Sequence, residues 1–343
     1  MKRFTRRSLL GAALALQAGG ASRAQPAERS LTDDAGRRVL LPARVERIFA
    51  AGPPASILLH ALAPEKLIGW TTPFREAEKP FMPPAALALP ALGRLTGRGG
   101  SVNLESLLAA RPDLIFDYGT VSPTFASLAD RVQAQTGIPY ILLDGALDKQ
   151  AGSILALGAA LGETPRATAL SAWVTESMAA LDTRQAGFSG KPPRVYYGRG
   201  PRGLDTGMAG SINTELIERL GAVNVAAALG RGGLAQVSVE QVLAWAPDII
   251  ITIDPNFFQL LRDDPIWRNM PAVRAGRCFL APNLPFGWID FPPGLNRLLG
   301  LDWLARRLYP ALFNDDPHPF VREAYRRLYH REPDTAQLAQ LLA

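Results

Sequence analysis

Arginines beside glycines recur at three places in the chain. Arg199 and Arg202 lie in Gly198-Arg-Gly-Pro-Arg-Gly203, while Arg98 and Arg231 each begin an Arg-Gly-Gly stretch. A guanidinium group is a planar fork of donors that fits carboxylate, catecholate or oxyanion oxygens, and glycines let the backbone approach a ligand closely. The pattern favours anion binding. Any one of these arginines can instead be a solvated turn residue, and Arg199 and Arg231 are the stronger candidates by context.

Three aromatic residues, Trp70, Tyr118 and Trp288, fall in or beside expected loops and can wall an organic ligand, although each can also be a core residue. Asp290 is unusual in an anion site, where it can orient an arginine, bind a cationic edge or cap a helix. In open α/β sheets, ligands bind outside the carboxyl ends of the strands. The expected ligand-binding residues are therefore Pro54, Trp70, Arg98, Tyr118, Arg199, Arg202, Arg231, Trp288 and Asp290.

An internal repeat defines the elements that would position these residues. Residues 103–116 align with residues 238–251, and six of the 14 positions are identical, against roughly one expected from composition. Each copy has an N-cap residue, Asn103 or Ser238, followed by an apolar helix, a Pro-Asp stop and a β-rich strand. The repeat predicts two similar α/β units.

Weaker matches surround both copies in the same order. First strands are expected at 47–50 and 194–197, helices near 55–62 and 213–220, and closing strands at 139–143 and 277–280. Strands that alternate with helices imply a mainly parallel sheet in each half. The predicted fold is α/β, with an N-terminal lobe at 25–162, a long linking helix at 163–187, and a C-terminal lobe with a helical tail at 188–343.

Residues 1–24 have the composition of a cleaved export signal, with a basic start, an apolar run of 12 residues and a small-residue cleavage site. Arg6-Arg7 resembles a twin-arginine signal, although an ordinary secretory signal is the alternative. The segment holds five basic residues and no acid, so its removal takes the formal charge from +6 to +1. A nearly neutral mature chain argues against nucleic acid as a partner. We expect a soluble periplasmic protein.

The sequence gives little support to an enzymatic activity or to a metal site. Gly198 to Gly203 matches the dinucleotide fingerprint G-x-G-x-x-G, but the next helix begins too late to hold a pyrophosphate, so an NAD-type oxidoreductase is a remote alternative. G-x-S-x-G, H-E-x-x-H and P-loop motifs are absent from the sequence. His60 is expected to be a core or surface residue, with haem ligation remote, and Cys278 to be an inert thiol. We expect no catalytic residue, no metal site and no cofactor.

The chain resembles the periplasmic binding proteins of iron-siderophore, haem and cobalamin ABC importers. The resemblance rests on residues 32–42 with Arg47 and Ile48, on the two Glu-containing Pro-Asp repeats, and on the segment 221–226. It implies two α/β lobes joined by one long helix, with a ligand bound in the cleft between them. It also implies that Glu105 and Glu240, one in each lobe, dock onto arginines of a permease dimer that works with ATPase subunits. In their own right, both glutamates also complement a helix dipole.

The predicted function is capture of an anionic ferric siderophore by a monomeric binding protein. A bare oxyanion such as molybdate or tungstate suits the same arginines, and cobalamin and haem are further alternatives.

Overall fold

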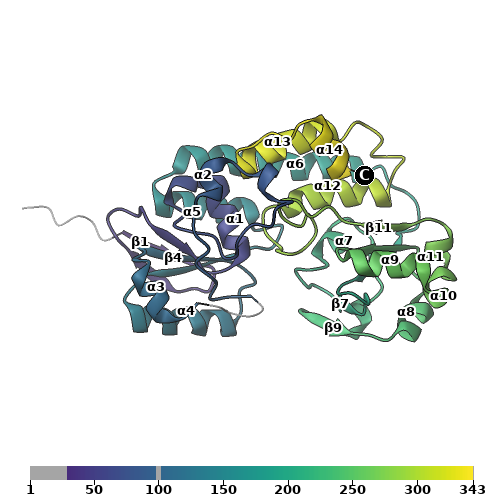
Figure 1. Cartoon of the computed structure of the whole chain (residues 1–343), viewed down its shortest axis with the longest axis horizontal. Helices are drawn as coiled ribbons and strands as arrows, with labels where there is room; N and C mark the ends of the chain where they lie inside the picture. The colour runs from purple at the N-terminus through teal and green to yellow at the C-terminus, as the bar shows by residue number, and fades with distance from the viewer. Residues whose placement is uncertain (1–28, 98–101, 343) are drawn as a thin grey trace, which may run out of the picture.

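The computed structural model describes residues 29–97 and 102–342, so Arg98 and the expected export signal lie outside the described residues. Figure 1 shows two lobes side by side with a layer of helices along one edge of both. This architecture confirms the predicted α/β class, with parallel sheets flanked by helices.

The N-terminal lobe is built on a three-stranded parallel sheet in the order β3-β4-β5, which comprises β3 (Ile48–Ala50), β4 (Leu114–Gly119) and β5 (Tyr140–Asp144). A separate antiparallel pair joins β1 (Arg29–Thr32) and β2 (Arg38–Leu41). Five of the six residues of β4 are buried, as expected for a parallel strand covered on both faces. The helices of this lobe are α1 (Pro53–Leu62), α2 (Pro84–Leu87), α3 (Leu104–Ala109), α4 (Pro123–Thr136) and α5 (Gln150–Leu161), with short 3₁₀ turns at Pro64–Lys66 and Lys79–Phe81.

The C-terminal lobe has a four-stranded parallel sheet in the order β11-β10-β6-β8. Its strands are β6 (Arg194–Gly198), β8 (Val223–Asn224), β10 (Ile249–Thr252) and β11 (Cys278–Leu280), and an antiparallel pair joins β7 (Asp205–Gly207) and β9 (Leu234–Gln236). The helices are α7 (Glu215–Arg219), α8 (Val239–Trp245), α9 (Pro255–Asp263), α10 (Pro265–Arg268) and α11 (Pro271–Arg274), with a 3₁₀ turn at Ala227–Leu229. Cys278 is half-buried, and burial raises the pKa of its thiol to about 12.

The repeated Pro-Asp pair joins strand to strand in both lobes. The Asp113 carboxylate accepts hydrogen bonds from the amides of Glu46 and Arg47, both at 2.9 Å, where the chain enters β3. The Asp248 carboxylate accepts from the amide of Arg194 at 2.8 Å, at the start of β6. In each lobe this aspartate therefore ties the start of the first strand to the strand of the repeat, with which it pairs in parallel.

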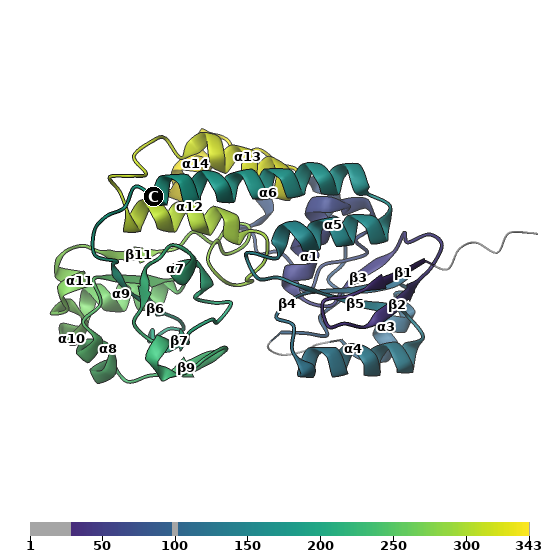
Figure 2. The same ribbon diagram turned by 180° about the vertical axis from the view of Figure 1, so that it is seen from behind.

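Helix α6 (Thr164–Gln185) connects the lobes in the chain, and α12 (Arg297–Leu308), α13 (His318–Tyr329) and α14 (Thr335–Leu342) lie in the same layer (Figure 2). The tail packs on more than the C-terminal lobe, to which the sequence assigned it. Helix α13 contacts α1, and the ring of His330 hydrogen-bonds the carbonyl of His60 at 2.8 Å. The cause is an apolar stripe on α13 that is buried across this junction: Val321, Ala324, Tyr325, Leu328 and Tyr329.

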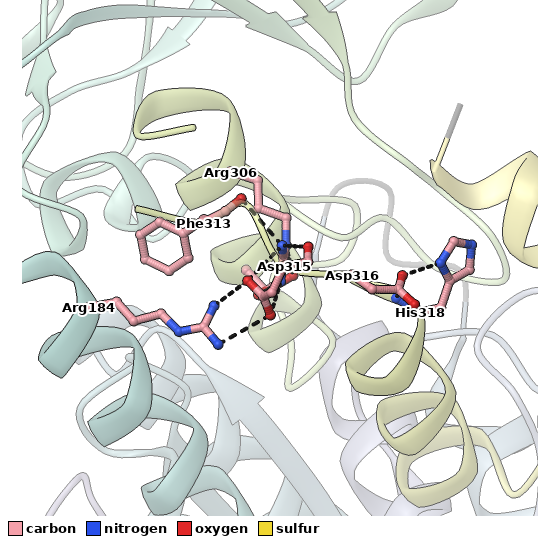
Figure 3. Close-up of polar contacts among 7 residues, drawn as sticks. Arg184, Arg306, Phe313, Asp315, Asp316 and His318 are labelled. Atoms are coloured by element: carbon pink, nitrogen blue, oxygen red, sulfur yellow. Dashed lines mark hydrogen bonds and ion pairs between the residues drawn. The ribbon is translucent and has the colours of Figure 1, made fainter. Parts of the chain in front are cut away.

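A charged cluster fastens the end of α6 to the segment that leads into α13 (Figure 3). The guanidinium of Arg184 donates to both carboxylate oxygens of Asp315, at 2.6 and 3.2 Å. Arg306 of α12 donates to the Asp315 carbonyl at 2.6 Å and pairs with Asp302 at 2.8 Å. The hydrogen bonds from Arg184, followed by those from Arg306, lower the pKa of Asp315 to about 2. Both helices are thereby joined to the tail.

Candidate ligand-binding site

The loop after β5 meets the C-terminal lobe at a buried charged junction. Arg297, whose side chain is fully buried, donates to the Glu215 carboxylate at 2.6 Å and to the Gly145 carbonyl at 2.5 Å. The same glutamate accepts from the amide of Leu147 at 2.9 Å. Residues from both lobes therefore share one hydrogen-bond network where the carboxyl end of the N-terminal sheet faces the other lobe. Arg297 was not among the predicted site residues, because nothing near it in the chain indicates its distant partners.

Arg199 and Asp290, two of the predicted site residues, form a buried ion pair. Nε of Arg199 lies 2.8 Å from Oδ2 of Asp290, and the two residues are 6% and 1% exposed. Asp290 also accepts hydrogen bonds from the Tyr197 hydroxyl at 3.0 Å, the Asn213 amide group at 2.9 Å and the Phe291 backbone amide at 2.7 Å. Of the three roles considered for Asp290, the geometry matches the orientation of an arginine.

The surroundings of this pair favour the charged form of Arg199. Burial alone would lower the pKa of Arg199, but the charge of Asp290 raises it above its ordinary value. Burial and then the charge of Asp290 also raise the pKa of Tyr197, so its hydroxyl remains a donor. Since both carboxylate oxygens of Asp290 accept hydrogen bonds, the carboxylate is held in place beside Arg199.

Arg199 and Arg202 together line a pocket of about 170 Å³, whose other walls include Asp205 and Gln236. Strands β7 and β9 carry part of its wall, and Figure 1 shows them at the edge of the C-terminal lobe that faces the other lobe. Pockets for organic ligands are usually about 300–1,000 Å³. A volume of about 170 Å³ lies below this range but is enough for a small ion.

Arg231 is exposed, and the loop beside it leads to the Arg199–Asp290 pair. Its backbone bridges to Ala209, while Gly232 donates to the Ala209 carbonyl at 2.8 Å. Gly232 and Gly233 have φ values of +69° and +68°, a region in which side chains other than hydrogen are disfavoured. The segment that begins at Ala209 continues to Asn213, whose side-chain amide donates a hydrogen bond to Asp290. Arg231 therefore lies beside the segment whose Asn213 binds Asp290, the partner of Arg199.

On the N-terminal lobe, the loop after β3 lies close to the segment that leads to Arg98. A Cβ atom on Gly52 would come within 2.5 Å of Oγ1 of Thr96, so only glycine fits. The Thr96 hydroxyl donates to the carboxylate of Asp117 at 3.1 Å. Pro54 is half-buried, and a Cβ atom on Gly294 would lie 3.3 Å from its Cα. Pro54 therefore lies against the loop that also carries Asp290.

The three aromatic residues predicted to line the ligand site are buried in the protein. Trp70 is 3% exposed and donates from Nε1 to the Ala86 carbonyl at 2.8 Å. Trp288 is 1% exposed and lies with its Nε1 3.4 Å from the Tyr325 hydroxyl. Tyr118 is also buried, and its hydroxyl has no hydrogen-bond partner among the described residues. Both tryptophan rings are enclosed because the tail helices and the loop before α12 pack over them.

Phe291 is a residue that the sequence reasoning missed. It is 66% exposed, its φ of +62° is strained for a residue with a bulky side chain, and its ring centroid lies 5.5 Å from Cζ of Arg199. Its exposed ring therefore adds an apolar face beside Arg199. The one signal in the sequence was its place between Asp290 and two prolines, in a loop after the last strand.

Glu105 and Glu240 occupy matching places in the first turns of α3 and α8, and both are exposed. Hydrogen bonding, first from the Ser238 side chain, lowers the pKa of Glu240.

No histidine, cysteine and carboxylate cluster of three or more that could hold a metal ion occurs within the described residues. No helix in the same part of the chain is long and apolar enough to cross a bilayer.

Two α/β lobes with parallel sheets, joined by a long helix and meeting at a polar junction, define the class of two-lobed solute-binding proteins. A family model described as periplasmic binding protein matches residues 82–284, more than half of the chain. The chain belongs to this family, as the sequence predicted.

The molybdate-binding protein MolA of Haemophilus influenzae is 27% identical, over 90% of this chain and 94% of MolA. An ABC transporter solute binding protein from Sulfurospirillum deleyianum is also 27% identical, with a TM-score of 0.83 over 91% of this chain and 98% of that one. The fold is shared with the periplasmic vitamin B12 binding protein BtuF of Vibrio cholerae, at 23% identity and a TM-score of 0.61 over 79% and 99% of the two chains. These relatives are solute-binding transport proteins, so the chain is a binding component of an ABC transporter and not an enzyme.

Proposed function

We propose that this protein captures a small oxyanion of the molybdate or tungstate type in the periplasm and delivers it, as a monomer, to a permease dimer with its ATPase subunits. The pocket lined by Arg199 and Arg202 carries the proposal, because its volume of about 170 Å³ suits a compact anion. The ferric siderophore favoured by the sequence needs a wider site with aromatic walls, and Trp70 and Trp288 are both packed in the core.

The chemistry of the site supports the same ligand. A tetrahedral dianion has four oxygens that need donors from several directions, and guanidinium groups and glycine amides supply them without bulky side chains. Asp290 fixes the orientation of Arg199 before a ligand arrives, so less side-chain freedom is lost on binding. The 27% identity with a molybdate-binding protein agrees with this choice.

A ferric catecholate complex is the second candidate, and one observation favours it. The ring of Phe291 is 66% exposed beside Arg199, which provides an apolar face next to a cation. That pairing fits a catecholate ring with charged oxygens.

Isothermal titration calorimetry of the purified mature protein tests the proposal. Molybdate and tungstate are expected to bind with a Kd in the micromolar range or below, while sulfate and phosphate, which have shorter bonds to oxygen, bind more weakly. Ferric catecholate and ferric citrate are titrated under the same conditions. Tight binding of a ferric complex with no heat from molybdate or tungstate would replace the first candidate by the second.

Arg202 provides the sharpest variant, because it lines the pocket, is exposed, and its loss leaves no buried charge unpaired. Since a charge-assisted hydrogen bond contributes about 1.5–3 kcal/mol, Arg202→Ala is expected to weaken the oxyanion about 10- to 150-fold. Arg202→Lys should restore part of the loss, because an ammonium group lacks the fork. Arg268→Ala, an exposed arginine on α10, is the matched control and should leave Kd unchanged.

A further inference from the structure

The pocket beside Arg199 contains a carboxylate as well as arginines. Asp205 lines it together with Arg202 and Gln236. The backbone of Asp205 is fixed beside Arg199, because the Asp205 carbonyl accepts from the Arg199 amide at 2.7 Å and the Asp205 amide donates to the Arg199 carbonyl at 3.3 Å. A Cβ atom on Gly200 would lie 3.6 Å from Oδ2 of Asp205, so the carboxylate lies against the turn that leads to Arg202. Any anion that enters the pocket therefore meets a negative group.

The Asp205 carboxylate has no ion pair and no hydrogen bond within the described part of the chain. Burial, followed by the charge of Asp205, raises the pKa of Tyr196, but the hydroxyl of Tyr196 donates to the Gly203 carbonyl at 2.6 Å instead. The guanidinium of Arg202 likewise has no ion pair or hydrogen bond among the same residues. Asp205 and Arg202 are therefore both available to a ligand.

The charges around the pocket balance one another. Arg199 is paired with Asp290 at 2.8 Å, and the charge of Arg202 is matched by that of Asp205. Arg231 does not line the pocket. A fully ionised dianion would therefore enter a site without excess positive charge, next to a carboxylate. Like charges that share a site disfavour each other's ionised form, so one of them takes up a proton.

We propose that Asp205 is a specificity-determining residue of this pocket, and that the oxyanion is bound together with one proton, held between a ligand oxygen and the Asp205 carboxylate. The proton comes from solution, and no bond to the central atom of the oxyanion forms or breaks. This inference rests on the proposed function, since it takes the pocket beside Arg199 as the oxyanion site.

The other ligand oxygens have donors in the same pocket. Gln236 on β9 lies directly opposite Asp205 on β7, and opposite residues of an antiparallel pair have their side chains on one face. Gln236 is exposed, so its amide group can donate to one ligand oxygen while Arg202 donates to others. The protonated oxygen donates to Asp205. Each of the three side chains thereby has a complementary group on the ligand.

A shared proton separates oxyanions by the basicity of their oxygens as well as by size. Molybdate and tungstate oxygens are more basic than sulfate oxygens, so they take up the proton more readily. Sulfate would remain unprotonated at neutral pH and would meet the Asp205 carboxylate without a donor. An unpaired charge placed against the wrong ligand is a general source of specificity. Asp205 therefore rejects an anion that resembles the ligand in shape and charge.

The groups around Asp205 do not supply the proton themselves. The charged groups nearby are Arg199 with Asp290, and Arg202, while Tyr196 on β6 is the neighbouring phenol. Arginine and tyrosine side chains titrate far above neutral pH. All three histidines of the chain lie in its described part, and none lines this pocket. A proton taken up on binding near neutral pH therefore reports the contact between the ligand and Asp205.

Isothermal titration calorimetry with molybdate, in two buffers of different ionisation enthalpy, measures this proton uptake. We expect wild type to take up about one proton, and its affinity to fall about tenfold for each unit of pH between about pH 6 and 8. Asp205→Asn should take up none, because an amide donates to the ligand directly. Its preference for molybdate over sulfate should fall by about tenfold or more. Asp263→Asn removes an exposed carboxylate of α9 outside the pocket, and this matched control should behave as wild type.

Two results would overturn the proposal. Wild type could bind molybdate without taking up a proton, or Asp205→Asn could keep both the proton uptake and the preference over sulfate. The first measurement needs no variant, so it decides the matter even if Asp205→Asn does not fold. Binding of molybdate without proton uptake would refute this inference and leave the proposed function intact. If neither molybdate nor tungstate binds to wild type or to either variant, the proposed function is refuted, and this inference with it.

Discussion

Replacing Arg199 by alanine should lower the free energy of unfolding, so this variant tests the stability of the folded protein rather than ligand binding. The change would leave the carboxylate of Asp290 buried without its cation. Removal of one partner of a buried ion pair costs about 3–5 kcal/mol. Asp290 would keep its hydrogen bonds from Tyr197, Asn213 and the amide of Phe291, so we expect the lower end, about 3 kcal/mol. Arg231→Ala, at an exposed site, should cost less than about 0.5 kcal/mol.

Urea unfolding followed by circular dichroism at pH 7 measures both effects. The cycle is completed by Asp290→Asn and by the double variant, in which the carboxylate that lacks a partner is removed with the arginine. The double variant should recover most of the stability lost in Arg199→Ala, because a neutral amide can keep hydrogen bonds without carrying a buried charge. If Arg199→Ala unfolds within about 1 kcal/mol of wild type, or if Asp290→Asn gives no recovery, the ion pair does not hold the loop as described.

Other predictions concern pH and docking. Burial, followed by the neighbouring charge of His330, lowers the pKa of His60 from 6.5 to about 4. As the pH drops below 6.5, His60 is protonated in the unfolded chain before it is protonated in the folded protein, so the free energy of unfolding falls. Wild type should therefore lose about 2 kcal/mol more than His60→Leu between pH 7 and 5 in urea titrations, and equal losses would contradict this. The pKa of Asp315 is lowered to about 2, so its ionised carboxylate stabilises the folded protein at pH 7. Because solvent screens this partly exposed group, Asp315→Asn should lower the free energy of unfolding by no more than about 1 kcal/mol at pH 7. The difference in melting temperature between Asp315→Asn and wild type should vanish as the pH falls from about 4 to 2. Glu105→Arg with Glu240→Arg should abolish ligand uptake by cells while Kd for the ligand stays within about twofold, and normal uptake would remove the docking role of the glutamates.

The repeat made much of the fold predictable. Its helix caps, Pro-Asp pairs and β-rich strands are local signals, and strands β4 and β10 with helices α3 and α8 follow them closely. The first and closing strands of each lobe were found because the same order recurs around both copies. Sequence pattern also placed the long helix, whose bounds of Thr164–Gln185 lie within the predicted 163–187.

The surroundings of the candidate site were less predictable, because they depend on contacts between distant segments. Trp288 follows a strand and precedes two prolines, which are the marks of an exposed loop. Its ring is nevertheless buried against Tyr325 of α13, 37 residues later in the chain. Likewise, Asp290 was recognised as unusual, but the sequence does not show that Arg199, 91 residues earlier, would be its partner.

The return of α13 onto α1 has a consequence for the order of folding. His330 and His60 are in contact although 270 residues separate them in the chain, so part of the N-terminal core is completed only by the last helices. Such long-range closure slows folding, since loop entropy is lost before the contacts form. A chain that stopped near Asp315 would leave the apolar face of α1 uncovered. We therefore expect the N-terminal lobe to complete its packing only after the tail helices are synthesised, and the two lobes to unfold together in one transition.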